Sequence, residues 1–183
     1  MSWSNSANRY SNPLIALHWL MLVLLVVVYA CMELKGFFPK GSDPRILMKS
    51  THFMLGLSVF ALVWLRLAAR FAGGAAPAIT PPAPTWQLLL SKAVHLALYA
   101  LMIGMPLGGW IILSAEGQPI PFFGLELPAL VGKNHALAEQ FEELHEIGAS
   151  VGYVLIGVHA AAALFHHYFM RDNTLRRMLP GRG

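Results

Sequence analysis

The sequence predicts an all-α membrane protein, a bundle of four transmembrane helices. Of its 183 residues, 56% are hydrophobic and only 12% are charged, and its mean hydropathy is +0.56. A soluble domain of this length needs more charge to cover its surface. Four apolar runs without a charged residue account for the excess, and they lie at 10–32, 50–65, 93–115 and 147–170.

A helix needs roughly 20 residues to cross a bilayer, and the length of each run is compatible with one membrane-spanning helix. Three runs reach that length alone, and the second reaches it if its helix begins near Ile46 and Arg66 extends its charge to the interface. The expected helices are therefore about 12–34, 46–69, 88–114 and 143–170, within one membrane domain at 1–183. The first run is too long, and its lead too poor in basic residues, for a secretory signal peptide, so we expect it to be retained.

The segments between the helices are too short for a separate soluble domain. Residues 71–85 are rich in Pro and Ala and predict an extended connector. The loop from 116 to about 142 mixes turn residues with a stretch that could form an interfacial helix, and 137–146 is polar enough to start outside the membrane and run into the fourth helix. The absence of an internal repeat disfavours a transporter built from inverted repeats.

The distribution of Lys and Arg predicts the orientation. With the N-terminus inside, the cytoplasmic segments hold eight of them: Arg9, Arg66, Arg70, Lys92, Arg171, Arg176, Arg177 and Arg182. The outer segments hold five: Lys35, Lys40, Arg45, Lys49 and Lys133. We therefore expect a bacterial inner-membrane protein with both termini in the cytoplasm. The pI of about 9.5 reflects these topogenic charges and requires no nucleic-acid partner.

The chemistry of the chain depends on its histidines. Cys31 is the only cysteine, which excludes disulfides within the chain, cysteine-ligated iron–sulfur clusters and a C-x-x-C-H haem attachment. Any redox centre must then be held by histidine. Seven of the eight histidines fall on the expected helices, and besides His167 they are His18, His52, His95, His145, His159 and His166. Ionisable residues inside a membrane are costly and are functional by default.

The histidine spacing predicts two pairs. His145 and His159 are 14 residues apart, so they share a helix face and lie about 21 Å apart along it. His18 lies early in a helix that enters from the cytoplasm, so it is at the depth of His159. His52 lies early in a helix that enters from outside, so it is at the depth of His145. Two bis-histidine pairs predict two b-type haems, because haem iron binds imidazole axially and two imidazoles leave no open position, which suits electron transfer.

The sequence argues against three alternative roles for these histidines. A single membrane histidine is often only a hydrogen-bonded packing residue, but paired depths on different helices argue against this. A proton relay usually includes membrane Asp or Glu, and none occurs inside the four apolar runs. One zinc ion cannot be shared across about 21 Å.

Further candidates lie beside the pairs. His166 follows His159 by seven residues on the same face, and His95 lies at a similar depth. A histidine near the aqueous boundary can donate a hydrogen bond to a quinone and relay protons, although a packing role is an alternative for both. We expect His135 and His167 to be solvated or near headgroups. The outer basic residues could concentrate a small anion or form a solvated rim: Lys35, Lys40, Arg45 and Lys49.

Five segments spanning nearly the whole chain carry a resemblance to a known family. They are ALHW around His18, MELKGFFP, HLALYALMIGMPLGGW, LHEIGASVGYVLIGVHAAAALFHHYF and DNTLRRMLP. With them the chain resembles the bacterial cytochrome b561 family, relatives of the cytochrome b subunits of hydrogenases and formate dehydrogenases. GFFP and HAAAALFHHYF look most like the superoxide oxidase branch, which takes electrons from superoxide at the periplasmic side and passes them to ubiquinone near the cytoplasmic side.

The resemblance implies a role for each matching residue. His18 and His159 would hold the cytoplasmic-side haem b, His52 and His145 the periplasmic-side one, and His166 would lie near ubiquinone. The implied activity is that of a superoxide:ubiquinone oxidoreductase. The alternative is an electron-conducting cytochrome b subunit that docks a hydrogenase- or dehydrogenase-type protein. We expect the first, because a docking subunit should carry an extended terminus or an extra helix.

Overall fold

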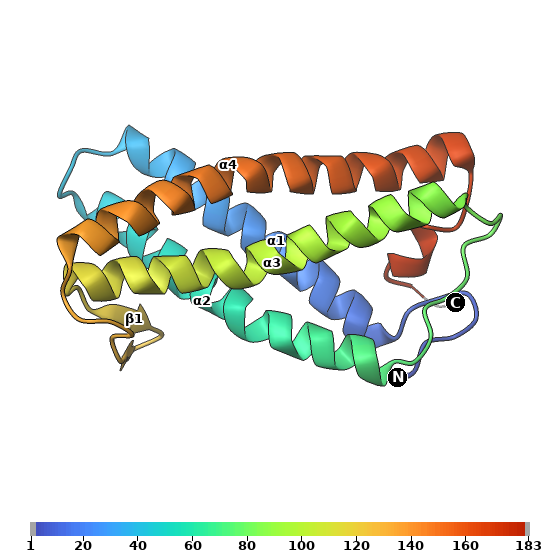
Figure 1. The fold of residues 1–183 in the computed structure, drawn as a ribbon, viewed down its shortest axis with the longest axis horizontal. Helices are drawn as coiled ribbons and strands as arrows, with labels where there is room; N and C mark the ends of the chain where they lie inside the picture. The colour runs from blue at the N-terminus through green and yellow to red at the C-terminus, as the bar shows by residue number, and fades with distance from the viewer. Residues whose placement is uncertain (1–2, 182–183) are drawn as a thin grey trace. The chain divides into compact units, whose positions relative to one another are not determined.

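A computed structural model describes residues 3–181, in which four long helices account for most of the chain (Figure 1). Their bounds are α1 Asn12–Leu34, α2 Asp43–Ala72, α3 Thr85–Glu116 and α4 His135–Phe165. A π-helical turn, His166–Met170, follows α4, and short 3-10 turns cover Lys35–Phe37 and Arg176–Met178. All four helices are long and apolar enough to cross a membrane. The predicted all-α fold with four membrane helices is confirmed. Arg182, counted above among the cytoplasmic charges, lies outside the described residues.

The chain divides into two compact units. Unit 1 comprises Met1–Leu20, Trp64–Ala100 and Val151–Gly183, and unit 2 comprises Met21–Val63 and Leu101–Ser150. Each long helix therefore contributes one stretch of residues to each unit.

Helix α1 has the expected bounds, whereas α2, α3 and α4 begin earlier than expected, and α4 differs most. It begins at His135 rather than near 143 and includes the polar stretch 137–146. Asn134 caps it: its side-chain Oδ1 accepts from Leu137 N at 3.1 Å and its carbonyl accepts from Ala138 N at 3.1 Å. Asparagine is a preferred N-cap because its oxygen satisfies an otherwise unpaired backbone N–H. The polar first turns after this cap conceal a helix start when only apolar runs are counted.

A small hairpin in unit 2 occupies part of the loop for which an interfacial helix was considered. Strands β1 (Ile120–Phe122) and β2 (Leu125–Leu127) pair antiparallel, with Ile120 opposite Leu127. Phe123 and Gly124 form the two-residue turn with φ of 49° and 85°. Positive φ at both positions is typical of a type I′ turn, whose twist matches that of the paired strands.

The hairpin packs on the helices of unit 2 through a small hydrophobic core. Leu57, Leu113 and Ile120 are buried together, and Phe53 and Trp110 pack against them. The indole Nε1 of Trp110 also donates to the Pro128 carbonyl at 3.0 Å. These contacts fix the end of α3 and the loop that leads toward α4.

The N-terminal and C-terminal segments are joined in unit 1 by hydrogen bonds near Tyr10 and Arg177 (Figure 1). Tyr10 N donates to the Arg177 carbonyl at 3.2 Å, and Trp19 Nε1 donates to the Met178 carbonyl at 2.7 Å. An Arg177 Nη1–H donates to the carbonyl of Pro77 in the connector between α2 and α3. The connector is therefore held by the tail rather than free.

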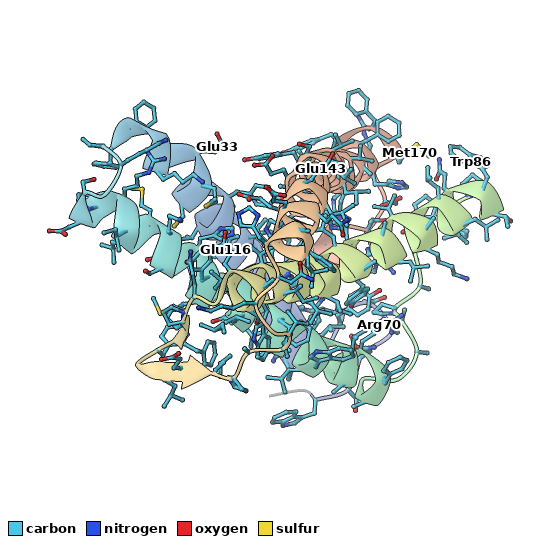
Figure 2. The ribbon with its side chains drawn as sticks, turned by 60° about the vertical axis from the view of Figure 1, so that its left-hand side comes forward. Glu33, Arg70, Trp86, Glu116, Glu143 and Met170 are labelled. Atoms are coloured by element: carbon cyan, nitrogen blue, oxygen red, sulfur yellow. The ribbon has the colours of Figure 1, made fainter. Side chains whose placement is uncertain are left out.

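Apolar side chains cover the outside of the helices, as contact with lipid requires. Trp86 and Met170 project outward in Figure 2 and are 63% and 41% exposed. On α1, Val23 and Val26 are 58% and 60% exposed. The exposed apolar surface agrees with helices that face a bilayer.

Candidate functional site

Three histidines from three helices meet in unit 1. They are His18 of α1, His95 of α3 and His159 of α4. The ring centres of His18 and His159 are 6.1 Å apart with planes at 77°, and those of His95 and His159 are 5.2 Å apart with planes at 79°. The structure thus brings together the cytoplasmic-side pair that the sequence predicts and places His95 beside it.

Unit 2 contains the second predicted pair. The ring centres of His52 on α2 and His145 on α4 are 6.2 Å apart, with planes at 71°. Nδ1 of His52 lies 3.0 Å from the Val28 carbonyl oxygen. Because a carbonyl can only accept, this contact assigns the N–H to Nδ1 and leaves a lone pair on Nε2. That tautomer is the one a metal-ligating histidine needs, with its other nitrogen held by a backbone carbonyl.

The distances between ring centres test whether each pair could hold one iron. An imidazole nitrogen lies about 2 Å from the metal it ligates, and the ring centre lies roughly 1 Å beyond that nitrogen. Two imidazoles on opposite sides of one ion therefore have centres about 6 Å apart. The separations of 6.1 Å and 6.2 Å fit this requirement. The 5.2 Å between His95 and His159 is too short for opposite faces of one ion.

Glycines give unit 2 the room that a flat macrocycle needs. A Cβ on Gly56, one turn from the His52 position, would meet no atom within 4 Å. On α3, a Cβ on Gly109 would lie 3.5 Å from Cε1 of His145, so the missing side chain lets this ring approach the α3 backbone. The Nδ1 atom of His145 is buried near the backbone of Met105 without making a hydrogen bond of normal geometry. A buried ring nitrogen without a hydrogen-bond partner is expected where a bound ligand completes the site.

Polar groups surround the histidines of unit 1. Nδ1 of His95 donates to the Ser91 carbonyl at 2.6 Å, which leaves its Nε2 available. Arg66 of α2 donates through Nε to the Tyr99 hydroxyl at 3.4 Å, and its Nη1 is buried with no hydrogen-bond partner among residues 3–181. Arg66 also acts electrostatically on the ring of His159. A buried guanidinium with a free donor suits a carboxylate or a carbonyl oxygen of a ligand.

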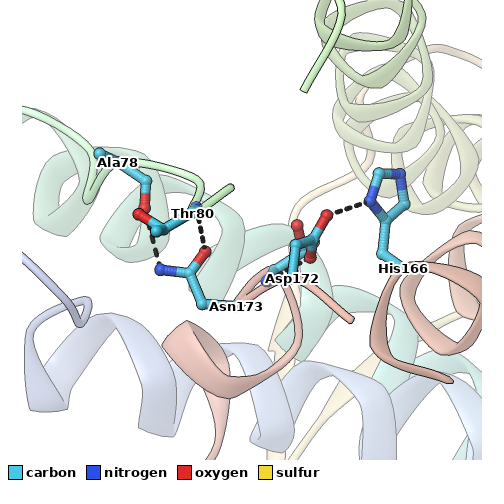
Figure 3. Close-up of polar contacts among 6 residues, drawn as sticks. Ala78, Thr80, His166, Asp172 and Asn173 are labelled. Atoms are coloured by element: carbon cyan, nitrogen blue, oxygen red, sulfur yellow. Dashed lines mark hydrogen bonds and ion pairs between the residues drawn. The ribbon is translucent and has the colours of Figure 1, made fainter. Parts of the chain in front are cut away.

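His166 makes a close contact that the sequence did not reveal. Its Nδ1 lies 2.5 Å from Oδ2 of Asp172, whose side chain is 4% exposed (Figure 3). Thr174 N donates to the other carboxylate oxygen at 2.8 Å. Burial raises the pKa of Asp172, but the hydrogen bonds from His166 and Thr174 outweigh it and hold this pKa below its ordinary value. Asp172 is therefore a carboxylate at neutral pH.

The remaining two histidines differ from each other. His135 opens α4 with an 85% exposed side chain, 3.4 Å from Oε1 of Glu139, and is solvated as expected. His167, which was expected to face headgroups or solvent, has a buried Nδ1 atom without a hydrogen-bond partner among the described residues. His167 is half-buried and lies in the π-helical turn that follows α4.

Known proteins identify the family of this four-helix arrangement. Residues 9–181 match the family described as prokaryotic cytochrome b561. This chain belongs to that family. Cytochrome b561 homolog 1 of Escherichia coli K12 is 40% identical over 175 residues, which cover 96% of this chain and 99% of the relative. Probable superoxide oxidase CybB of Yersinia pestis is 36% identical over 172 residues, or 94% and 96% of the two chains. Cytochrome b561 homolog 2 of E. coli K12 is 30% identical over 187 residues, or 98% and 95%.

Membership of the cytochrome b561 family confirms the family predicted from the sequence. It makes this chain a multi-pass membrane electron-transfer protein, and it implies haem b as the cofactor. The donor sets of both histidine pairs fit that group, because each supplies two imidazoles at a distance suited to one iron.

Proposed function

We propose that this cytochrome b561 holds two haem b groups and carries electrons from superoxide to ubiquinone. The observation that carries the proposal is the presence of two histidine pairs, each with ring centres about 6 Å apart. His18 and His159 bind one haem, and His52 and His145 bind the other. Haem iron with two axial imidazoles accepts and releases one electron at a time. The printed name of the Yersinia relative, a probable superoxide oxidase, supports superoxide as the donor.

Ubiquinone binds in unit 1 in this proposal. Its headgroup has two carbonyl oxygens that need hydrogen-bond donors, and it needs protons as it is reduced. His95 and His166 each use Nδ1–H within the protein, toward Ser91 and Asp172, so Nε2 of each is an acceptor in the neutral ring and can donate to a quinone oxygen when the ring is protonated. The unpaired Nη1 of Arg66 adds a donor that suits a carbonyl oxygen.

Superoxide is oxidised at unit 2, on the periplasmic side. Lys35 acts electrostatically on the ring of His52, so it can attract a small anion toward this pair. Arg45, from the same basic cluster, instead donates to the carbonyls of Lys35 and Phe38 at 3.3 Å and 2.9 Å. Arg45 therefore has a structural role in the cluster, and Lys35, on which the charges of Lys49, Arg45, Glu142 and Glu146 act, is the member that acts on His52.

The proposed orientation places both termini in the cytoplasm of a bacterium, with the chain in the inner membrane. It rests on the count of eight Lys and Arg against five. Topology reporters fused at Gly183 and inserted beside Lys40 measure it directly. An external C-terminus would reverse the two sides.

The function is tested with purified, haem-loaded protein, an enzymatic source of superoxide and a soluble ubiquinone. We expect superoxide to reduce the haem and ubiquinone to reoxidise it, with quinol as the product. His166→Ala should keep both haem spectra and their reduction by superoxide, yet slow reoxidation by ubiquinone. Haem that superoxide does not reduce would favour the alternative, an electron-conducting subunit that depends on a hydrogenase- or dehydrogenase-type partner.

A further inference from the structure

The contact between His166 and Asp172 determines which nitrogen of the ring is available. A carboxylate can only accept hydrogen bonds, so the 2.5 Å contact assigns the N–H to Nδ1 of His166. Nε2 then carries a lone pair in the neutral ring and a proton in the charged ring. Oδ1 of Asp172 is held by Thr174 N at 2.8 Å, so the carboxylate cannot turn away without losing that bond.

The chain after α4 is shaped to bring this carboxylate to the ring. The π-helical turn ends at Met170, Arg171 takes the left-handed conformation with φ of 55°, and Asp172 N donates back to the His166 carbonyl at 3.2 Å. A left-handed conformation costs energy for a residue other than glycine and persists only where the surroundings impose it. π-helical turns occur frequently at functional sites.

The connector between α2 and α3 holds the residue that follows Asp172. Asn173 Oδ1 accepts from Thr80 N at 2.9 Å, its Nδ2 donates to the Ala78 carbonyl at 3.1 Å, and its own N–H donates to the Thr80 carbonyl at 3.2 Å (Figure 3). Three hydrogen bonds to a neighbouring segment leave Asp172 little freedom. The position of the Asp172 carboxylate is therefore fixed by the turn at Arg171 before it and by the hydrogen bonds of Asn173 after it.

The basic side chains of this unit have contacts of their own. The guanidinium groups of Arg70 and Arg177 lie over the Tyr10 ring, at 5.9 Å and 5.6 Å from its centre. Arg177 also donates to the Pro77 carbonyl, and Arg9 Nη2 donates to the Leu179 carbonyl at 3.2 Å. Within the described part of the chain, the ion pair of Asp172 is the one with His166.

We infer that Asp172 is a positioning residue that directs Nε2 of His166 toward the quinone, so that this histidine delivers the protons of quinone reduction. The inference rests on the proposed function and deepens it. Two superoxide anions each lose one electron and become O₂, and one ubiquinone gains two electrons and two protons and becomes ubiquinol. His166 gives a proton from Nε2 to a quinone oxygen and takes the next one from cytoplasmic water. While the ring is charged, the carboxylate beside Nδ1 balances it.

Asp172→Asn tests this role in the full-length, haem-loaded protein. The amide keeps the size of the side chain, but it can donate to Nδ1 and so favour the opposite tautomer. We expect unchanged haem content and unchanged haem reduction by superoxide, reoxidation by ubiquinone slowed roughly 10- to 100-fold, and a changed pH profile of that step. Asp172→Glu should recover part of the rate.

A matched control lies at the start of α4. Glu139 also contacts a histidine, His135, but both side chains are well exposed, at 68% and 85%. Glu139→Gln should leave the rate and the pH profile of quinone reduction unchanged. If Asp172→Asn behaves like Glu139→Gln, Asp172 has no positioning role.

A second measurement does not depend on turnover. Nitrogen-15 NMR of histidine-labelled protein reports the tautomer of each ring, and the signals of His166 are those lost in His166→Gln. We expect an Nδ1–H tautomer in the wild type and its loss in Asp172→Asn. The same tautomer in both proteins would overturn the inference. If the wild type shows this tautomer but reduces no ubiquinone, the proposed function and the proton delivery assigned here both fail, and only the contact with Asp172 stands.

Discussion

The two histidine pairs have nearly the same geometry but different surroundings. Ring centres are 6.1 Å apart in unit 1 and 6.2 Å apart in unit 2. In unit 1 a third histidine, His95, and the buried Nη1 of Arg66 lie beside the pair, whereas in the described part of unit 2 the His145 ring approaches glycines. Similar pairs can hold similar redox groups. The side chains around each pair differ, so the reactions that accompany electron transfer can differ between the two units.

The two units also differ in charge, since unit 1 is basic and unit 2 is acidic. Unit 1 contains eight Lys and Arg and one acid, and unit 2 contains five Lys and Arg and eight acids. The single acid of unit 1 is Asp172, the residue that contacts His166. The acids of unit 2 include Glu33 and Glu116 at the ends of α1 and α3, and Glu143 within α4 (Figure 2).

The largest expected effect separates the two pairs. In the proposed function each ring would supply one of two bonds to an iron, so His159→Ala should remove the haem of unit 1 and keep that of unit 2, and His145→Ala should do the reverse. Pyridine haemochrome analysis should therefore show one haem per chain in either variant and two in the wild type. His135→Ala is the control and should keep both. Loss of the same haem in both variants would contradict the pairing.

The next prediction distinguishes His18 from His95 as the second ligand, with His159, of the haem proposed in unit 1. His18→Ala should remove the unit 1 haem, whereas His95→Ala should retain it, since 5.2 Å is too short for opposite faces of one iron. Haem content and optical spectra measure this difference. A variant series in which His95→Ala loses the haem and His18→Ala keeps it would reverse the assignment.

The next prediction concerns the outer basic cluster of unit 2. Lys35→Gln should slow the reduction of haem by superoxide several-fold at low salt, because Lys35 acts electrostatically on His52. The difference from the wild type should shrink as ionic strength rises. Lys133→Gln, an exposed change in unit 2 outside this cluster, is the control. Equal rates for Lys35→Gln and the wild type at low salt would show that the cluster is only a solvated rim.

The smallest expected effect concerns the start of α4 in unit 2. Asn134→Ala removes the side-chain bond to Leu137 N and should lower the free energy of unfolding by about 1 kcal/mol. Thermal unfolding followed by circular dichroism should show a lower Tm with haem content unchanged. Asn134→Asp, which keeps an accepting oxygen, should restore most of the stability. No change in Tm with the alanine variant would mean that the cap contributes little.

Much of this architecture could be predicted because its causes are periodic. Apolar runs of membrane length locate four helices, and a spacing of 14 residues between His145 and His159 predicts two levels on α4. The depth of each partner then follows from the direction in which its helix crosses the membrane. These predictions need only helix geometry and the cost of burying polar groups.

The parts that could not be predicted depend on contacts distant in sequence or on local backbone changes. Asp172 was not considered because it lies beyond the apolar runs, and only the left-handed turn at Arg171 brings it to His166. Gly109 matters only because His145 of another helix approaches it. Asn134 did carry a local signal, an N-cap residue before a helical stretch, which the polar turns after it concealed.

The joined chain ends in unit 1 have a consequence for the order in which the protein is made. Every residue of unit 2 precedes position 151, whereas unit 1 needs the last segment of the chain. The bonds from Tyr10 and Trp19 to Arg177 and Met178 close a loop from residue 10 to residue 178. A ribosome makes the residues that complete unit 1 after all those of unit 2, so His52 and His145 can meet before the structure around His18 and His159 is complete.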